Sequence, residues 1–310
     1  MTWYNGFLAF LYADYPKRSP VFTPQPNLNP LIIAHRGDQE SAPENTLPAI
    51  KAAIAKQVDF VELDIRLTSD GVPVLMHDSS TKRTTNKDLL VSETSLEELR
   101  TLDAGSWFAP EFKGTKIPTL EDALDLAQGK ICLFADIKSR VNFLMIRQLK
   151  AFAEGSRSGC LIVSTRNGGG KKTDDLDDQF KIADEKIRRM LLSHARESRK
   201  LHSAQIAAFM RYWPDAPLIQ PYKRTDTPED LLKTFPGLVA VLPQVSVLTP
   251  DIVNSIHASG LLVLILIRSD IREDVSYRRG LDVGIDGIWV SDVDSLKSLL
   301  NDYKKEAQYH

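Results

Sequence analysis

The stretch FVELDIRLTSDGVPVLMHD (residues 60–78) has the pattern of a strand, a tight turn and a returning strand. Side chains alternate across a strand, so Glu62, Asp64 and Arg66 share one face, while the apolar residues between them share the other. Carboxylates on an inward face are costly unless they hold a cation or a buried base. The first strand therefore predicts a polar site at its carboxyl end, with its apolar face packed against helices.

The turn of this stretch contains Asp70 and Gly71, a dipeptide typical of a two-residue type I′ hairpin. A turn flanked by Ser69 and Val72 sets a register in which His77 lies opposite Asp64. The hairpin would return an imidazole to the edge that carries the two carboxylates. A slip of one residue would instead turn the imidazole to the other face.

Two further segments place ionisable residues at strand ends. ICLFADIK places Asp136 and Lys138 two residues apart at the end of one apolar run, and LIIAHRG places His35 and Arg36 at the end of another. In a parallel α/β barrel the carboxyl ends of all strands lie on one face, where catalytic groups gather. We therefore expect one site that is formed by His35, Arg36, Glu62, Asp64, His77, Asp136 and Lys138.

The carboxylates Glu62, Asp64 and Asp136 would form a hard oxygen site that suits Ca²⁺ or Mg²⁺, whereas zinc usually draws histidine or cysteine ligands. His35 and His77 could be zinc ligands, but acid and base catalysis beside a hard cation is the interpretation we prefer. A surface salt bridge would be the ordinary explanation for any one carboxylate. Their matching strand positions favour a functional site.

From residue 31 onward, short apolar runs alternate with amphipathic stretches, which predicts a largely parallel α/β barrel of about 250 residues. There is one more candidate strand than the eight barrel positions, and the hairpin strand at 72–77 is expected to pair outside the ring. Strands are expected at 31–34, 60–65, 72–77, 131–137, 189–193, 216–220, 238–243, 261–267 and 287–290. Helices are expected at 47–56, 95–101, 119–127, 141–154, 197–212, 228–234, 249–258 and 293–304.

The barrel domain is expected over residues 31–304, after an aromatic and proline-rich extension (1–30) and before a short tail (305–310). Two stretches interrupt its rhythm, an insertion at 79–118 and a long glycine- and charge-rich loop at 155–186. The GGGKK run in that loop lacks the helix start of a phosphate-binding loop, so a solvated loop is the preferred interpretation.

The composition is that of a soluble globular protein, with 43% hydrophobic and 26% charged residues, a net charge of −2 and a pI near 6.3. This balance predicts neither nucleic-acid binding nor adsorption to an anionic membrane. Two cysteines cannot build a disulfide framework. With no secretory signal in the first residues, a cytoplasmic location is expected. The aromatic residues of the extension are expected to pack on the domain, with a lipid surface or a partner as the alternative.

The chain resembles the glycerophosphodiester phosphodiesterase family, a TIM-barrel branch of the phosphatidylinositol-phospholipase-like phosphodiesterases. The resemblance covers about residues 31–300 and is most specific in the first half. The matching segments are AHRG, PENT, VELDIRLTSDG, VPVLMHD, TKRTTN, SLEELRTLDAGSWF, IPTLEDAL and GIDGIWVSD.

The resemblance implies a TIM (β/α)8 barrel with an insertion after the third strand segment. It also implies a metal site formed by Glu62, Asp64 and Asp136, an acid–base pair formed by His35 and His77, and phosphate contacts from Arg36 and Lys138. Glu44 of PENT would orient Arg36 or a metal-bound water. The alternative for Glu44 is an acid in the first turn of the helix that follows Thr46.

The sequence departs from the family pattern at two places. The family usually has Glu-Ile-Lys where this chain has Asp136-Ile137-Lys138, so the third carboxylate is one methylene shorter and could reach a metal through water. The family usually has Trp-Thr-Val-Asn where residues 266–269 read Leu-Ile-Arg-Ser. Because that tryptophan often lines the alcohol pocket, a different substrate preference is expected.

The activity implied is metal-dependent hydrolysis of a glycerophosphodiester, of the glycerophosphocholine or glycerophosphoethanolamine type, to glycerol 3-phosphate and an alcohol. One alternative is a lysophospholipase D that acts on lysophospholipids, which would suit the aromatic extension and the apolar Leu266 region. Another is a catalytically inactive barrel that binds phosphodiesters or a protein partner. The residues assign neither an oligomeric state nor the separate roles of the two histidines.

Overall fold

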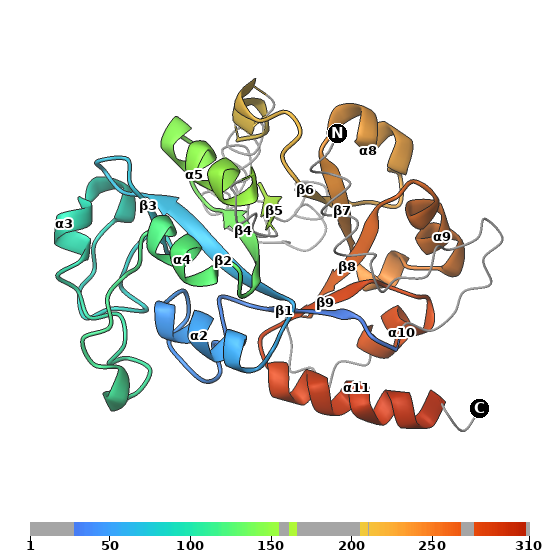
Figure 1. The fold of residues 1–310 in the computed structure, drawn as a ribbon, viewed down its shortest axis with the longest axis horizontal. Helices are drawn as coiled ribbons and strands as arrows, with labels where there is room; N and C mark the ends of the chain where they lie inside the picture. Colours follow the sequence, from blue (N-terminus) through green and yellow to red (C-terminus); the bar gives the residue numbers. More distant parts are fainter. Residues whose placement is uncertain (1–27, 155–160, 166–204, 210, 268–275, 308–310) are drawn as a thin grey trace, which may run out of the picture.

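The computed structural model describes residues 28–154, 161–165, 205–209, 211–267 and 276–307. Within them, eight parallel strands form a closed ring in the order β1–β2–β4–β5–β6–β7–β8–β9, because β1 pairs with both β2 and β9 (Figure 1). The expected TIM (β/α)8 barrel is confirmed. The strands are β1 (Leu31–Ala34), β2 (Phe60–Leu67), β3 (Pro73–Leu75), β4 (Cys132–Ile137), β5 (Leu161–Ser164), β6 (Leu218–Tyr222), β7 (Leu238–Pro243), β8 (Leu262–Leu266) and β9 (Gly287–Val290).

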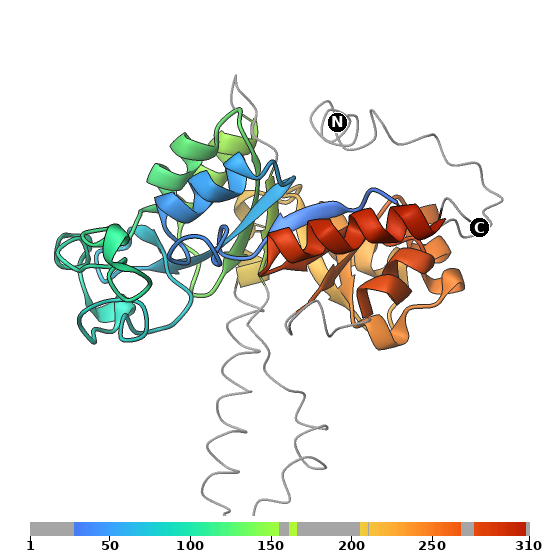
Figure 2. The same cartoon turned by 90° about the horizontal axis from the view of Figure 1, so that it is seen from below.

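Helices surround the ring (Figures 1 and 2). Three of them begin in the same way, with the side chain of Thr46, Thr227 or Thr249 accepting a backbone N–H and a proline in the first turn. Threonine satisfies an orphan donor there, and proline needs none. The α-helices within the described residues include α2 (Leu47–Ala55), α3 (Leu96–Leu99), α4 (Leu120–Ala127), α5 (Phe143–Glu154), α8 (Pro228–Thr234), α9 (Pro250–Ala258), α10 (Ser276–Asp282) and α11 (Val293–Ala307).

Two hydrophobic layers hold the barrel together. One lies between the strands and the surrounding helices, and the other fills the interior of the ring with side chains such as Phe60, Phe134 and Trp289. Phe60 lies two residues before Glu62 and Phe134 two residues before Asp136, so each inward row changes from aromatic to acidic toward the carboxyl end. The interior of the barrel is therefore filled with apolar side chains toward the amino ends of these strands and is polar toward their carboxyl ends.

The hairpin after β2 has a different register from the predicted one. Leu67 pairs with Pro73 and Ile65 with Leu75, which places Met76, not His77, opposite Asp64. A type I′ turn needs a positive φ at both central residues. Gly71 has a φ of 78°, but Asp70 does not have a positive φ, so the prediction of a type I′ turn is wrong. The Oγ1 of Thr68 accepts the Val72 N–H at 2.9 Å and closes a three-residue loop that has its left-handed residue last. The prediction that β3 pairs outside the ring is confirmed.

The second half of the barrel differs from the sequence expectation at three places. Strand β5 occupies a ring position but lies inside the range 155–186, which was predicted to be a loop. Its four residues, three of them apolar, are too few to show a period. Helix α10 was not predicted, and α11 continues to Ala307, into the predicted tail. The predicted strand at 189–193 lies outside the described residues, as do residues 1–27, whereas the predicted helix at 197–212 is helical at 205–209 and 211–212.

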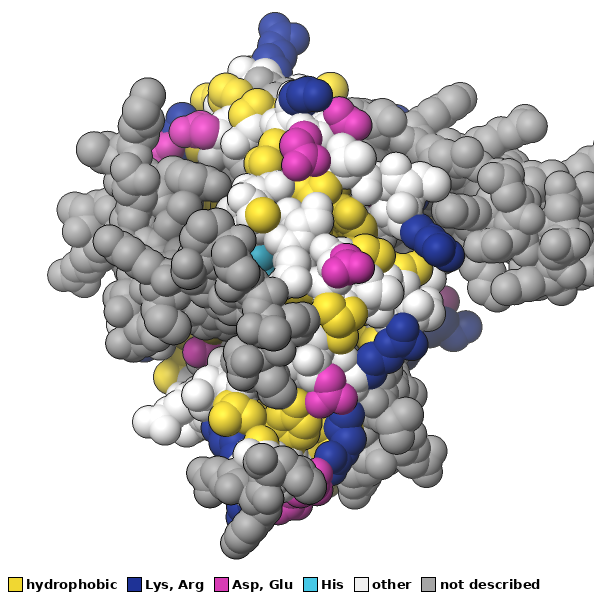
Figure 3. Space-filling model, turned by 90° about the vertical axis from the view of Figure 1, so that its right-hand side faces the viewer, with side chains coloured by type: hydrophobic (Ala, Val, Ile, Leu, Met, Phe, Trp, Pro, Cys, Tyr) yellow, Lys and Arg dark blue, Asp and Glu magenta, His cyan; other side chains and the backbone are white. Residues whose placement is uncertain are grey.

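The insertion at 79–118 contains α3 and two short 3₁₀ helices, η1 (Val91–Glu93) and η2 (Pro110–Phe112). It has its own apolar cluster, which includes Leu99 and Ile117, and it projects on the side away from α10 and α11 (Figures 1 and 2). None of the helices in the described residues is both long enough and apolar enough to span a bilayer. On the face in Figure 3, the described basic and acidic side chains are interspersed.

Candidate active site

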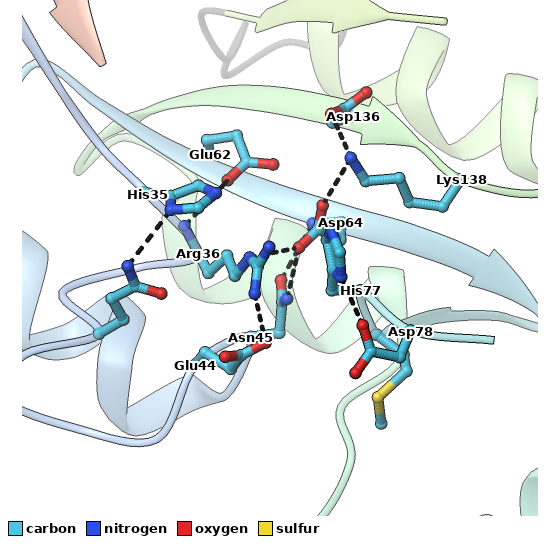
Figure 4. A network of polar contacts seen from close by, with 12 residues as sticks. His35, Arg36, Glu44, Asn45, Glu62, Asp64, His77, Asp78, Asp136 and Lys138 are labelled. Atoms are coloured by element: carbon cyan, nitrogen blue, oxygen red, sulfur yellow. Dashed lines mark hydrogen bonds and ion pairs between the residues drawn. The ribbon is translucent and has the colours of Figure 1, made fainter. Parts of the chain in front are cut away.

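Glu62, Asp64 and Asp136 converge at the carboxyl ends of β2 and β4. The two strands are paired so that Asp64 lies beside Asp136, and all three side chains are 0% exposed. One carboxylate oxygen from each lies within 4.8 Å of the others. His35 and Arg36 reach the same place from the end of β1, and Lys138 reaches it from the end of β4 (Figure 4). The structure thus brings together residues that are about a hundred positions apart in the chain.

Two cations compensate part of this buried negative charge. The Nζ of Lys138 lies 2.6 Å from Asp136 Oδ2 and 3.1 Å from Asp64 Oδ1, and the Nε of Arg36 lies 3.1 Å from Asp64 Oδ2. Burial alone would raise the pKa of Asp64, but the charges of Lys138 and Arg36 lower it to about 2. Asp64 is therefore a carboxylate at any physiological pH.

Among the described residues, Glu62 forms no ion pair with a lysine or arginine, and the charge of Lys138 offsets only part of the rise in its pKa. Its Oε2 accepts the Arg36 backbone N–H at 2.9 Å, but its Oε1 and the Oδ1 of Asp136 make no hydrogen bond to any described residue. Burial, together with the charges of Asp64 and Asp136, raises the pKa of Glu62 well above its usual value. A bound divalent cation would supply both the missing charge and a partner for these oxygens. The all-oxygen set suits Ca²⁺ or Mg²⁺, so the residues fit such an ion.

The ring of His35 is fixed from two sides. Its Nδ1 lies 3.2 Å from Ser291 Oγ and 3.2 Å from Gln39 Nε2, and the ring meets Trp289 edge-on at a centroid distance of 5.5 Å. Burial, followed by the charge of Arg36, lowers the pKa of His35 to about 3. The imidazole is therefore neutral. No role was predicted for Gln39 or Ser291, although Ser291 stands directly after the strand β9.

His77 belongs to a second network, which runs into the insertion. Its Nδ1 lies 2.6 Å from Asp78 Oδ1, and Asp78 Oδ2 accepts from Arg83 Nε at 2.7 Å. Arg83 also donates to both oxygens of Glu44, at 2.7 and 2.8 Å. Asp78 and Arg83 lie in segments that match the family pattern, but no role was predicted for either of them.

Glu44 links this network to the cluster of buried carboxylates, since its Oε1 accepts a hydrogen bond from Nη1 of Arg36 at 2.9 Å. Glu44 is thus in contact with Arg36, and its role in orienting that arginine stays a prediction. The alternative, an acid in the first turn of α2, is wrong because α2 begins after Thr46 and has no acid in its first turn.

Asn45 is a residue of the site for which no role was predicted from the sequence. Its Nδ2 donates to Asp64 Oδ2 at 2.8 Å and its Oδ1 accepts the Asp64 backbone N–H at 3.0 Å, so a single buried amide braces the carboxylate. Asn45 has a φ of 56°, a conformation that asparagine tolerates better than most residues. This double contact gives a physical reason for the asparagine of the PENT segment.

Gly37 allows the loop after β1 to pass against α2. Its φ is +85°, and a Cβ built there would lie 2.6 Å from Ala49 Cβ. We expect Gly37→Ala to lower the free energy of unfolding by about 2–5 kcal/mol, from left-handed strain plus overpacking. Gly129→Ala, at φ +68° with open space around it, is the matched control and should cost only the strain, about 1–2 kcal/mol. Urea unfolding measures both, and equal losses would contradict the packing argument.

The late strand that lacks the family tryptophan is β8. Leu266, its last residue, is half-buried and packs against the cluster inside the ring. Residues 268 and 269 of the Leu-Ile-Arg-Ser run lie outside the described part of the chain. The described end of this strand therefore presents an apolar side chain at the barrel mouth.

These features define a class of protein: a TIM barrel with a buried carboxylate cluster, histidines and a lysine at the carboxyl ends of its strands. The model of the glycerophosphoryl diester phosphodiesterase family matches residues 35–295, and the chain belongs to this family.

Individual relatives agree with this assignment. The chain is 40% identical over 141 residues to the glycerophosphodiester phosphodiesterase of Caldanaerobacter subterraneus subsp. tengcongensis, covering 44% of this chain and 58% of the relative. It is 38% identical over 136 residues to glycerophosphodiester phosphodiesterase 1 of Mus musculus, covering 43% and 41%. The matches thus span about half the length of these relatives. An Oleispira antarctica phosphodiesterase, solved in complex with the product sn-glycerol-3-phosphate, has the same fold, with a TM-score of 0.64, 23% identity and coverage of 88% of this chain and 97% of that one.

Proposed function

We propose that the protein is a metal-dependent glycerophosphodiester phosphodiesterase that releases glycerol 3-phosphate and an alcohol. The observation that carries the proposal is a set of three fully buried carboxylates flanked by Lys138 and His35, in which Glu62 Oε1 and Asp136 Oδ1 have no hydrogen-bond partner among the described residues. Burying an acid without a full counter-charge is costly, so such an acid at the mouth of a barrel indicates a functional site. The family match supports the same reaction class.

Glu62, Asp64 and Asp136 would hold the cation. When bound, a divalent cation neutralises charge on a phosphodiester and polarises its P–O bonds. Lys138 has three N–H donors, of which Asp64 and Asp136 engage two, so one is left for a phosphate oxygen. Arg36, held by Glu44 and Asp64, adds a second positive group, and together they favour a ligand with one negative phosphate.

His35 and His77 would move the protons. As the attacking oxygen bonds to phosphorus, one imidazole takes its proton, and the other gives a proton to the alkoxide that leaves when the second P–O bond breaks. A well-placed acid or base contributes about 10²–10⁴ in rate. Because the pKa of His35 is lowered to about 3, its ring enters the reaction neutral.

Two observations support the choice of substrate class, one from the relatives and one from the barrel mouth. Glycerophosphodiester phosphodiesterases are the named relatives, and the Oleispira antarctica structure holds sn-glycerol-3-phosphate, so a glycerol phosphate group on one side of the phosphorus is the preferred assignment. The half-buried Leu266 adds an apolar contact, which is the observation that favours a lysophospholipid as the second candidate substrate.

A product assay separates the two candidates. We expect glycerophosphocholine to give choline and glycerol phosphate with Mg²⁺ or Ca²⁺, and EDTA to lower the rate to background, because the carboxylates would lose their counter-charge. Lysophosphatidylcholine would give choline and lysophosphatidic acid if the second candidate is right. Release equal to that of His35→Ala under every condition would rule out both and leave a binding protein.

A further inference from the structure

The orientation of His77 is not set by the strand that precedes it. Strand β3 ends at Leu75, and its register places Met76 opposite Asp64, so strand alternation does not direct the imidazole to the carboxylates. Yet Figure 4 shows the ring beside Asp64, and its side chain keeps 33% of its surface exposed. Contacts other than strand pairing must therefore hold this partly exposed ring in place.

Arg66 holds the backbone of His77. Its Nε and Nη2 donate to the His77 carbonyl oxygen at 2.9 and 2.7 Å, and its Nη1 donates to the Lys138 carbonyl oxygen at 3.2 Å. Arg66 lies on β2 between the two segments and shares a face with Glu62 and Asp64. One planar guanidinium thus ties His77, two residues before the insertion, to Lys138, the residue after β4. A lysine ammonium lacks the forked geometry that spans both carbonyls.

Arg83 holds the ring through Asp78. It grips Asp78 Oδ2 with Nε while its two terminal nitrogens are bound by Glu44, so the guanidinium is fixed on both sides. Burial opposes ionisation of Asp78, but the hydrogen bonds from Arg83 and His77 outweigh it and lower the pKa of Asp78. An ionised carboxylate only accepts hydrogen bonds, so the Nδ1 of His77 must carry the proton. The other ring nitrogen, Nε2, is then left for the reaction.

We propose that Arg66 and Arg83 are positioning residues that clamp His77, Arg66 at its backbone carbonyl and Arg83 at its ring through Asp78. The expected effect of the clamp on turnover rests on the proposed function. Its expected effect on the tautomer of the His77 ring does not. It makes the insertion a working part of the site, because Arg83 belongs to residues 79–118.

Kinetics give the first test. We expect Arg83→Gln and Arg66→Gln to lower kcat on glycerophosphocholine about 10–100-fold, as a misplaced group does, with KM within about twofold. Arg83→Lys should recover part of kcat through its charge. Arg100→Gln is the matched control and should retain full kcat, since Arg100 also belongs to the insertion but forms an exposed ion pair with Asp122 of α4 at 3.1 Å. Equal kcat in wild type and Arg83→Gln would overturn the clamp.

The state of the ring gives the second test. In full-length protein with ¹⁵N-labelled histidine, at an alkaline pH where imidazole is neutral, the His77 signal is identified by its loss in His77→Gln. We expect the Nδ1-protonated tautomer in wild type and a mixture in Arg83→Gln. An unchanged tautomer in Arg83→Gln, or an Nε2-protonated ring in wild type, would overturn the clamp. If wild type cleaves no glycerophosphodiester, but the tautomer differs between wild type and Arg83→Gln as expected, the proposed function is refuted and the clamp is supported.

Discussion

Glu62→Gln is expected to abolish cation binding while leaving the metal-free fold at least as stable as wild type. Glutamine keeps the shape and the backbone contact to Arg36 but not the charge that burial opposes, as shown by the raised pKa of Glu62. Wild type should gain several degrees in Tm on addition of Mg²⁺ or Ca²⁺, because an ion that binds only the folded state stabilises it. We expect Glu62→Gln to lose this gain and at least about 100-fold in kcat.

Thermal unfolding with and without cation measures the first effect. Glu93→Gln provides the matched control, because Glu93 is an exposed acid in the insertion, and it should keep the full cation-dependent rise in Tm. If Glu62→Gln kept that rise as well, the cation would have to bind elsewhere.

His35→Gln and His77→Gln are each expected to lower kcat by about 10²–10⁴, the usual contribution of a positioned acid or base. The double variant should lose less than the product of the two factors, because groups that act in one transition state are not additive. Steady-state kinetics with glycerophosphocholine measures all three.

His257→Gln is the control for these variants. His257 contacts Asp286 at 2.7 Å just before β9, at the opposite end of the barrel, so its loss should leave kcat/KM within about threefold of wild type. Equal losses in the His257 and His35 variants would indicate a general effect on folding.

Strand alternation was enough to predict the acidic part of the site. Glu62 and Asp64 follow Phe60 on the inward face of β2, and Asp136 follows Phe134 on β4, so a local pattern of two residues fixes where they point. The carboxyl ends of parallel strands then share one face of the barrel, so the meeting of the three acids could be inferred without coordinates.

The register of His77 could not be predicted in the same way. It depends on one hydroxyl, since Thr68 Oγ1 bonds to both Asp70 and Val72 and converts a two-residue turn into a three-residue loop. The Asp-Gly dipeptide is compatible with either turn, and a slip of one residue changes the face of every side chain that follows within the strand.

The braces of the site escaped prediction because each depends on a long-range contact. Asn45 meets Asp64, and Ser291 meets His35, through loops whose shape is not encoded in a local pattern. Strand β5 was missed for a different reason, since LIVS is short and is apolar on both faces, as a buried parallel strand requires. Periodicity shows neither kind of feature.

Asp136, where the family pattern has glutamate, is held by Lys138 through one oxygen and leaves only Oδ1 without a hydrogen-bond partner among the described residues. The shorter side chain therefore keeps its ion pair and offers a single oxygen to a cation. Glu62 and Asp64 would then provide most of the direct protein contacts. This division of roles makes Glu62 the most informative position at which to test the site.

The most direct test of the metal site is a crystal of the full-length protein grown with Mn²⁺, a divalent ion that also prefers oxygen ligands. We predict an anomalous peak roughly 2.0–2.6 Å from carboxylate oxygens of Glu62 and Asp64, with Asp136 facing it directly or through one water. A map with full side-chain density but no peak among these three carboxylates would contradict the account.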